Sequence, residues 1–421
     1  MKVLWFTTDI PDIYQKKSDY NGGGWIRSLL YSFSQYNPDI SIGFAFPCCT
    51  DKKISINGNI TYFPLSKSVP SKYEKLKKYW GIKKQNDYFL CKQEVIRCIE
   101  KFNPDIIQIF GVEHGLASIV ELTNIPTVIH IQGLLTPYDN AFFPPSFNKF
   151  SCIINGNFIR ECIIRNGFIY KKKSLGNEAK NEKRRFKHTR YIMGRTEWDY
   201  KISSLYSPKA QYFKINECLR PEFLETNYKQ HNIDKNNIIL VSTISETFYK
   251  GFDTILKTAK ILKDDLNVNF HWHIIGLKEN SSFVKIFEKQ LNIYTTKYPI
   301  VFKGILTSKA LKQELSNSDI FIHPSYIDNS PNSVCEAQIS GIPVISTNVG
   351  GIGSLIEHNK TGLLVPTNSP HEIAYYIIKL TNDDKLRNSI IKAAIDIAKE
   401  RHNPIKICSD ILDAYKYIIN K

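Results

Sequence analysis

Two carboxylates separated by a loop of small residues carry the most chemical information in this chain. Asp328 and Glu336 flank the seven residues 329–335, which include Asn332 and Ser333. The apolar run 334–337 predicts a helix, for which Asn332 or Ser333 is a suitable N-cap. A helix N-terminus attracts phosphate, and a carboxylate accepts hydrogen bonds from sugar hydroxyls. The spacing therefore suits a sugar nucleotide, although a capped helix with surface acids is the simpler alternative.

The stretch 324–366 resembles the donor-binding signature of retaining GT-B glycosyltransferases of family 4. In that signature a Glu, seven residues and a second Glu are followed by Gly-x-Pro-Val-x-x-Thr and a pair of glycines. Asp328 stands where the family usually has its first Glu, and it keeps the charge. The positions that match the rest of the signature are Glu336, Gly341, Pro343, Val344, Thr347, Gly350 and Gly351. The resemblance is close over most of 238–400 and loose over the first 220 residues.

The resemblance extends to the other residues of the predicted donor site. Lys250 and Gly251 match a Lys-Gly pair that opens a helix, which implies that Lys250 meets the donor diphosphate. The family often has an Arg seven residues earlier, where this chain has Thr243. Gly304 and Leu306 resemble the turn whose backbone reads the nucleobase. The resemblance further implies that Glu336 holds the ribose, that Asp328 contacts the donor sugar, and that the diphosphate also meets the backbone at Ser330, Pro331, Asn332 and Ser333.

Further candidate contacts lie in the first half of the chain. A triple glycine at 22–24 precedes a helical pattern and offers backbone N–H groups, although a flexible turn would have the same sequence. His130 and Gln132 share one face of a strand end, because their spacing is two residues. A buried structural histidine is the alternative there. The resemblance places these and neighbouring residues beside the donor: Gly23, Gly24, His130, Gln132, Gly133 and Arg195.

The pattern of apolar runs predicts an α/β fold of two doubly wound halves. Strand-like runs at 2–8, 42–46, 105–110, 127–131 and 190–193 alternate with helical patterns. After Arg220 the alternation restarts, with strands expected at 238–242, 271–275, 300–303, 320–323 and 343–346. The resemblance implies a GT-B fold of two Rossmann-like domains facing a central cleft. We expect an acceptor-side domain over 1–220, a nucleotide-sugar domain over 221–403, and a helix over 404–421 that crosses back to the first domain.

Composition limits where the chain works and what it binds. No window contains the eighteen or so apolar residues of a membrane span, and no signal peptide is evident. Nine cysteines without metal-ligand spacing favour a reducing compartment and argue against zinc. No Asp-x-Asp follows a strand end, so we expect neither a metal nor a cofactor, with the diphosphate held by Lys250 and N–H groups. These features predict a cytoplasmic protein.

A net charge of +16 is concentrated in two segments. Residues 171–190 contain nine Lys or Arg, and residues 71–84 contain six Lys with Tyr73, Leu76 and Trp80 at helical spacing. Such segments suit the anionic inner face of a membrane. Nucleic acid and plain solvated surface are the alternatives.

The sequence therefore predicts a retaining, metal-independent glycosyltransferase. The expected donor is a nucleotide-sugar, and the expected acceptor is a hydroxyl on a lipid-linked glycan of surface polysaccharide biosynthesis. Two other functions stay open on the residues alone. A sugar-nucleotide epimerase would need acid and base groups acting on sugar carbons, and a basic nucleic-acid binder would leave the alignment of Asp328, Glu336 and Lys250 unexplained.

Overall fold

The computed structural model describes residues 1–11, 14, 24–48, 53–67, 90–113, 115–145, 147–156, 158, 161–162, 167–225 and 233–421. Its chain divides into two units. Unit 1 consists of Met1–Thr136, Asn177–Cys218 and Asn403–Lys421, and unit 2 consists of Pro137–Gly176 and Leu219–His402. Within the described residues, no helix is both long and apolar enough to cross a membrane.

Unit 1 is built on a sheet to which the described residues contribute eight strands, in the order β3-β4-β2-β1-β5-β6-β7-β8. All neighbouring strands are parallel except β3 and β4. The strands are β1 (Lys2–Phe6), β2 (Ser41–Cys48), β3 (Ser55–Asn57), β4 (Ile60–Ser66), β5 (Ile106–Phe110), β6 (Thr127–His130), β7 (Tyr191–Gly194) and β8 (Gln211–Lys214). The helices are α1 (Gly24–Tyr36), α3 (Lys92–Phe102), η2 (Gly115–Leu122), α6 (Glu197–Tyr206) and α14 (Pro404–Ile419).

Strand β1 shows why this sheet is covered on both faces. Every residue of β1 after Lys2 is fully buried, as expected for a central parallel strand. Because side chains alternate along a strand, Val3 and Trp5 face one side and pack with α1 and α14. Leu4 and Phe6 face the other side and pack with α3 and η2. The indole N–H of Trp5 donates to the Tyr415 hydroxyl at 2.8 Å, which ties α14 to the first strand.

Unit 2 contains a second parallel sheet, whose six described strands follow the order β11-β10-β9-β12-β13-β14. They are β9 (Ile238–Thr243), β10 (Phe270–Ile275), β11 (Ile300–Gly304), β12 (Ile320–His323), β13 (Val344–Thr347) and β14 (Leu363–Val365). The larger helices are α8 (Phe252–Lys260), α9 (Ser282–Leu291), α10 (Ser308–Ser316), α11 (Asn332–Ile339), α12 (Pro370–Asn382) and α13 (Asp384–Arg401). Short turns are α7 (Pro221–Leu224), η5 (Phe248–Lys250), η6 (Ile261–Asp265), η7 (Thr295–Lys297) and η8 (Ile352–Ser354).

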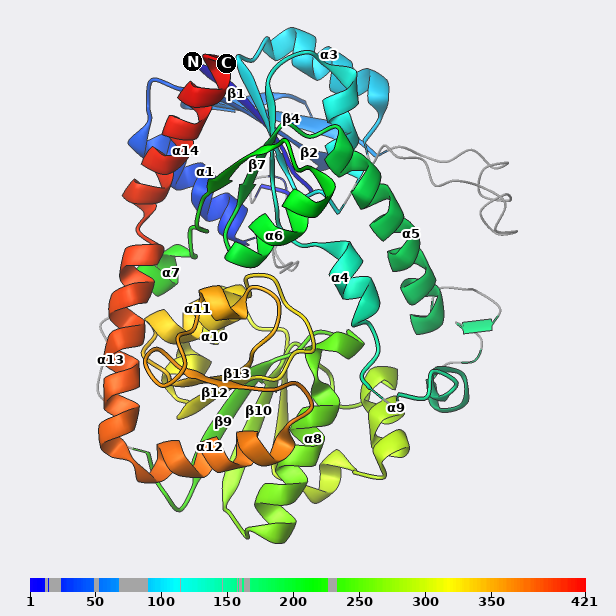
Figure 1. Ribbon diagram of the computed structural model, residues 1–421, viewed down its shortest axis with the longest axis vertical. Helices are drawn as coiled ribbons and strands as arrows, with labels where there is room; N and C mark the ends of the chain where they lie inside the picture. The colour runs from blue at the N-terminus through cyan, green and yellow to red at the C-terminus, as the bar shows by residue number, and fades with distance from the viewer. Residues whose placement is uncertain are drawn as a thin grey trace. The chain divides into compact units, whose positions relative to one another are not determined.

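The segment Pro137–Gly176 belongs to unit 2, although it comes from the first half of the sequence (Figure 1). It includes most of α4 (Leu135–Asn140), then η3 (Cys152–Gly156) and the start of α5 (Phe168–Lys187). Phe142, Phe147 and Phe168 surround Phe248, with ring centroids 4.7–6.1 Å away. The structure thus differs here from the expectation of one continuous domain over 1–220, because these aromatic side chains bury their surface against unit 2.

The expected strands all correspond to observed strands. Strands β3, β4 and β8 had no prediction, and Pro64 within β4 obscures its pattern. Helix α5 had been read only as a basic run. Residues 71–84 and Gly23 lie outside the described residues, so the predictions made for them stay predictions.

Candidate donor site

The candidate site of unit 2 lies where the order of its strands reverses. Strand β9 has β10 on one side and β12 on the other, so the crossovers run in opposite directions from this pair. In open parallel sheets, ligands bind outside the carboxyl ends of the two strands at such a point. Lys250 follows β9 and Asp328 follows β12, which brings these two predicted residues to the same place.

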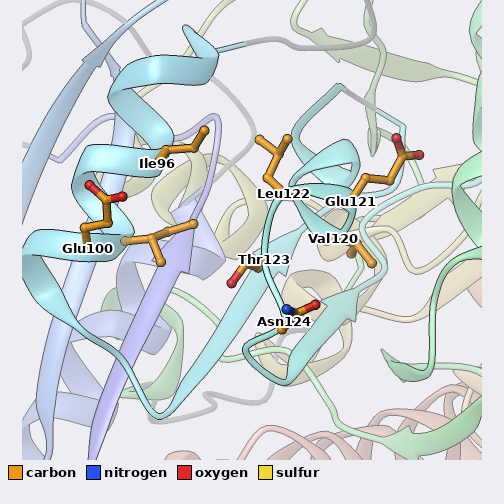
Figure 2. A pocket seen from close by; sticks show the side chains of 8 residues that line it. Ile96, Glu100, Val120, Glu121, Leu122, Thr123 and Asn124 are labelled. Atoms are coloured by element: carbon orange, nitrogen blue, oxygen red, sulfur yellow. The ribbon is translucent and has the colours of Figure 1, made fainter.

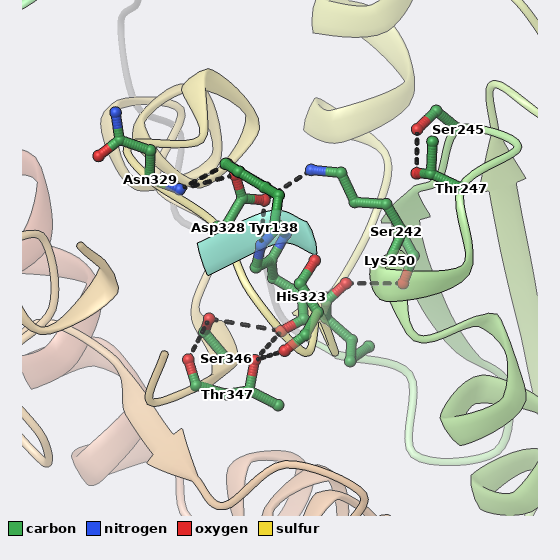
Figure 3. Close-up of polar contacts among 12 residues, drawn as sticks. Tyr138, Ser242, Ser245, Thr247, Lys250, His323, Asp328, Asn329, Ser346 and Thr347 are labelled. Atoms are coloured by element: carbon green, nitrogen blue, oxygen red, sulfur yellow. Dashed lines mark hydrogen bonds and ion pairs between the residues drawn. The ribbon is translucent and has the colours of Figure 1, made fainter. Parts of the chain in front are cut away.

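Lys250 and Asp328 are in direct contact (Figure 3). The ammonium Nζ lies 2.6 Å from Asp328 Oδ2, and the His323 Nε2 atom lies 3.0 Å from the same oxygen. Burial opposes the charge of Asp328, but the Lys250 ammonium and His323 outweigh it and hold the pKa of this carboxyl well below its usual range. Burial lowers the pKa of His323, which favours a neutral ring. The paired charges of Lys250 and Asp328 are therefore both present at neutral pH.

Two glycines allow the backbone to close around this pair. Gly251 has φ of 75°, and a Cβ there would overlap the carbonyl oxygen of Pro324. Gly350 has φ of 52°, and a Cβ there would overlap the carbonyl oxygen of Asp328. The next N–H, from Gly351, donates to that carbonyl at 3.1 Å. Positive φ and close approach both require glycine at these places, which accounts physically for the two glycines matched in the sequence.

The loop between the carboxylates leads directly into α11, but its cap differs from the prediction. Pro331 occupies the N-cap position and makes no side-chain cap hydrogen bond, whereas Asn332 or Ser333 was expected there. The fixed φ of proline suits a helix entrance without such a bond. The buried Asn332 Oδ1 and Ser325 Oγ atoms have no hydrogen-bond partner among the described residues. Polar atoms of this kind next to an uncapped helix start are suited to a polar ligand.

Glu336 is not part of the Lys250 and Asp328 contact and instead pairs with Arg220. The Arg220 guanidinium donates to Glu336 Oε1 from Nε at 2.9 Å and from Nη2 at 2.6 Å. Its Nη1 donates to Ser308 Oγ at 3.0 Å, and the guanidinium lies over the ring of Phe223. Both charged side chains are more than nine-tenths buried. This pair fixes the orientation of the Glu336 carboxylate within unit 2.

Gly304 and Leu306 lie at the end of β11, which is separated from β9 by β10. The Gly304 carbonyl accepts from the Gly276 N–H at 2.7 Å, and Gly304 has φ of 63°. Leu306 packs partly buried against the core. The structure thus places these two residues two strands away from Lys250 rather than in contact with it.

The remaining predicted residues belong to unit 1. His130 ends β6 and is fully buried, with Nδ1 3.2 Å from Gln108 Nε2. Burial, helped by the Arg195 guanidinium, lowers the pKa of His130 to about 3. Arg195 donates to the Gln132 carbonyl at 2.6 Å and lies 3.8 Å from the Glu217 carboxylate. Arg195 was predicted to lie beside the donor, and in the structure its charge is paired with the Glu217 carboxylate.

The other unit 1 candidates that the structure describes are Gly133 and Gly24. Gly133 follows Gln132 directly after β6, at the carboxyl edge of the sheet. Gly24 is the first residue of α1, and its carbonyl accepts from the Ser28 hydroxyl at 2.9 Å.

Three residues of the unit 2 site were not predicted from the sequence. Arg220 was used only to mark the restart of the pattern, although an arginine buried beside the helix start needs a carboxylate partner. His323 was given no role in the donor site. The Tyr138 hydroxyl donates to Asp328 Oδ1 at 3.2 Å, although Tyr138 lies 190 residues earlier in the sequence. No local sequence pattern predicts such a contact.

A separate pocket of about 510 Å³ opens between α3 and η2 in unit 1 (Figure 2). Its charged lining groups are Glu100 and Glu121, which would repel a diphosphate. Its walls precede β5 and β6, at the amino edge of the sheet rather than at the carboxyl edge where ligands bind. This pocket is therefore a poor candidate for a nucleotide-sugar. The residues that line it are Ile96, Ile99, Glu100, Val120, Glu121, Leu122, Thr123 and Asn124.

Residues 224–396 match the family described as glycosyl transferases group 1. The amylovoran biosynthesis glycosyltransferase AmsK of Erwinia amylovora is 23% identical over 225 residues, covering 51% of this chain and 54% of that protein. The N,N'-diacetylbacillosaminyl-diphospho-undecaprenol alpha-1,3-N-acetylgalactosaminyltransferase of Campylobacter jejuni is 29% identical over 195 residues, covering 46% and 48%. The chain spans about half the length of the curated relatives it matches.

Similar solved structures extend over nearly the whole chain. A sucrose-phosphate synthase from Thermosynechococcus elongatus superposes with a TM-score of 0.68 at 13% identity, covering 99% of this chain and 98% of that one. Anabaena HepE, solved in complex with UDP and glucose, gives 0.58 at 14% identity and covers 98% of both chains. These likenesses establish the fold, and the family match covers the part of unit 2 that contains Lys250, Asp328 and Glu336. Residues 224–396 are thus similar to the glycosyl transferases group 1 family, and the fold of the chain is GT-B.

Proposed function

We propose that this chain is a retaining glycosyltransferase of family 4 that moves a sugar from a nucleotide-sugar to a hydroxyl acceptor. The observation that carries the proposal is the contact of Lys250 with Asp328 at the switch point of the unit 2 sheet. A cation and a sugar-binding carboxylate stand together there, beside a helix start that no side chain caps. The cation and the helix start suit the diphosphate of the donor, and the carboxylate suits its sugar.

In this proposal, the donor exchanges one ion pair for another. The diphosphate takes the Lys250 ammonium from Asp328 and also accepts hydrogen bonds from the backbone N–H groups of Ser330, Asn332 and Ser333. Asp328, released from lysine, then accepts hydrogen bonds from hydroxyls of the donor sugar. Glu336, oriented by Arg220, accepts from the ribose hydroxyls. The diphosphate therefore replaces Asp328 as the partner of Lys250, and the sugar hydroxyls replace Lys250 as partners of Asp328.

The chemical step would use the donor itself as the base. The bond between the anomeric carbon and the diphosphate oxygen breaks, and the electron pair leaves with the diphosphate. The acceptor oxygen bonds to the same face of the anomeric carbon, and its proton passes to the departing phosphate oxygen. Lys250 and the helix start stabilise the charge that develops on the diphosphate. This route retains the anomeric configuration and requires no metal ion.

The test is a panel of nucleotide-sugars with release of the nucleoside diphosphate as the readout. We expect one donor to be turned over, and proton NMR of the product to show the donor's anomeric configuration. An inverted product would contradict the retaining mechanism. Interconversion of a nucleotide-sugar without release of its diphosphate would indicate an epimerase instead, and no reaction with the whole panel would contradict the proposal.

We further propose that the acceptor is a lipid-linked glycan used at the inner face of the membrane by a cytoplasmic enzyme. The printed names of the relatives support this, since one acts on a diphospho-undecaprenol substrate and another on amylovoran biosynthesis. Helix α5 adds support, because its Lys171, Lys173, Lys180 and Lys187 are exposed. Not every cation of α5 is available, since Arg185 is buried and donates to the Val112 carbonyl at 3.2 Å.

An apolar face on η3 supports the same proposal. Phe150, Ile154 and Phe158, which lie in or beside this turn, are 58%, 76% and 58% exposed. Cys152 within the turn is buried, and Gly156 lies against Ile286 of α9. A turn that is apolar on its outer side and preceded by Lys149 suits the interface of an anionic bilayer.

Co-sedimentation with vesicles tests this attachment. The protein should pellet with anionic vesicles and not with neutral ones, and about half-molar salt should release it, since screening weakens attraction between charges. Charge reversal of the four exposed lysines should weaken binding, and so should Ile154→Asp. Leu205→Asp is the matched control, because Leu205 is equally exposed, at 71%, on α6. Equal binding by Ile154→Asp and wild type would remove η3 from the proposal.

A further inference from the structure

The hydroxyl of Tyr138 closes a small hydrogen-bond circuit with Asp328 (Figure 3). It donates to Asp328 Oδ1 at 3.2 Å and accepts from the Asn329 N–H at 3.0 Å. The Asn329 N–H also lies 3.0 Å from Asp328 Oδ1. All three residues belong to unit 2, although Tyr138 lies in the segment contributed by the first half of the chain.

The two oxygens of Asp328 therefore have different partners. Oδ2 is next to the Lys250 ammonium at 2.6 Å and His323 at 3.0 Å. Oδ1 is next to Tyr138 and the Asn329 N–H. A carboxylate held at both oxygens has little freedom to rotate, and a sugar-binding carboxylate is effective only in one orientation.

The position of Tyr138 is set by core packing rather than by its hydroxyl alone. Its ring centroid lies 5.0 Å from that of Tyr249, and Phe142 four residues later lies 6.1 Å from Phe248. Burial and the nearby Asp328 charge raise the pKa of Tyr138 well above its ordinary value. The hydroxyl thus stays protonated, and it remains a hydrogen-bond donor throughout the pH range of an enzyme assay.

We infer that Tyr138 is a positioning residue for Asp328, and that it holds this carboxylate in place when the donor diphosphate takes Lys250 away. The inference rests on the proposed function. Before the donor binds, Lys250 and Tyr138 both orient Asp328. Once Lys250 bonds to phosphate, the carboxylate is kept facing the sugar by the Tyr138 hydroxyl, the Asn329 N–H and His323. The segment Pro137–Gly176 thereby contributes to donor recognition without contacting the diphosphate.

Tyr138→Phe tests this by removing one oxygen atom and leaving the ring in its packing. The loss of a hydrogen bond to a charged group predicts a ten- to hundred-fold lower kcat/KM for the donor, with the thermal midpoint nearly unchanged. The control is Tyr298→Phe. The Tyr298 hydroxyl donates to Asp264 at 3.0 Å, so the control also removes a tyrosine hydrogen bond to a carboxylate, but outside the site, and should leave kcat/KM unchanged.

A double-mutant cycle with Asp328→Asn separates positioning from a general structural effect. Donor affinity measured by titration calorimetry should fall with Tyr138→Phe in the wild-type background and change less than about twofold in the Asp328→Asn background, because coupled residues are not additive. Equal losses in both backgrounds, or wild-type kinetics for Tyr138→Phe in an active enzyme, would overturn the inference alone. A wild-type protein that neither binds nor turns over any nucleotide-sugar would overturn the proposed function, and this inference with it.

Discussion

Replacement of Glu336 by Gln should destabilise unit 2 strongly, although the two side chains have the same shape. The substitution removes the only charge that Glu336 offers to the Arg220 guanidinium, which donates to it at 2.9 and 2.6 Å. Both side chains are more than nine-tenths buried, so water cannot replace the lost partner. Breaking a buried ion pair from one side typically costs about 3–5 kcal/mol, because the remaining charge stays buried.

The cost should appear as a large drop in the melting temperature. A unit of roughly 220 residues loses about 2–4 °C per kcal/mol, which predicts a fall of roughly 6–20 °C in the unit 2 transition. Differential scanning calorimetry measures it. Replacing both residues, as Arg220→Met with Glu336→Met, should recover at least half of the loss, since apolar side chains of similar volume can substitute for a buried pair. A melting temperature of Glu336→Gln within about 2 °C of wild type would refute this account of the pair.

The same variant separates the structural role of Glu336 from its proposed role in the donor site. Donor affinity should be measured well below both melting temperatures, where the variant is folded. We expect it to fall there too, and Glu336→Ala to abolish transfer. Unchanged donor affinity and turnover in folded protein would leave Glu336 as a partner of Arg220 alone.

Three further predictions follow from the site. Lys250→Ala should lower kcat more than it raises the donor KM. The expected loss of transition-state stabilisation is about 2.7–4 kcal/mol. An effect on KM alone would make Lys250 a plain binding residue. EDTA should leave transfer intact, whereas loss restored by Mg²⁺ or Mn²⁺ would contradict the metal-free proposal. The pKa of His130 is lowered to about 3 in the fold, so the unfolded chain binds a proton below about pH 6.5 and the folded chain does not. Stability should therefore fall as the pH drops from 6.5 toward 3, by up to about 1.4 kcal/mol per pH unit, and His130→Gln should make the slope of melting temperature against pH shallower; an identical slope would contradict a neutral, buried His130.

The sequence predicted those parts of the site that follow from local pattern. Lys250 comes just after β9 and Asp328 just after β12, and both positions follow from apolar runs ended by turn residues. The alternation of strands and helices predicted the two sheets for the same reason. The family resemblance then supplied the roles of these residues, which the spacing alone does not give.

Contacts between distant residues were not accessible in this way. Tyr138 reaches Asp328 across 190 residues, and Arg220 reaches Glu336 across 116. No spacing in the sequence identifies Asp328 as the partner of Tyr138, or Glu336 as the partner of Arg220. The N-cap prediction for α11 was wrong for a local reason. Pro331 occupies the helix entrance ahead of Asn332 and Ser333, and rankings of N-cap propensity do not take its fixed φ into account. The unit to which Pro137–Gly176 belongs depends on where its phenylalanines bury their surface, which is a property of the whole fold.

The hydrogen bond between Trp5 and Tyr415 has a consequence for how the chain folds as it is made. It joins residues 410 apart, so the sheet of unit 1 gains its α14 cover only after residues 404–419 have been added. Unit 2 ends at His402, so every residue it needs has already been added by then. Unit 1 is thus completed after unit 2. During the intervening seconds of synthesis, the apolar face of β1 that α14 later covers would be exposed to chaperones and to other nascent chains.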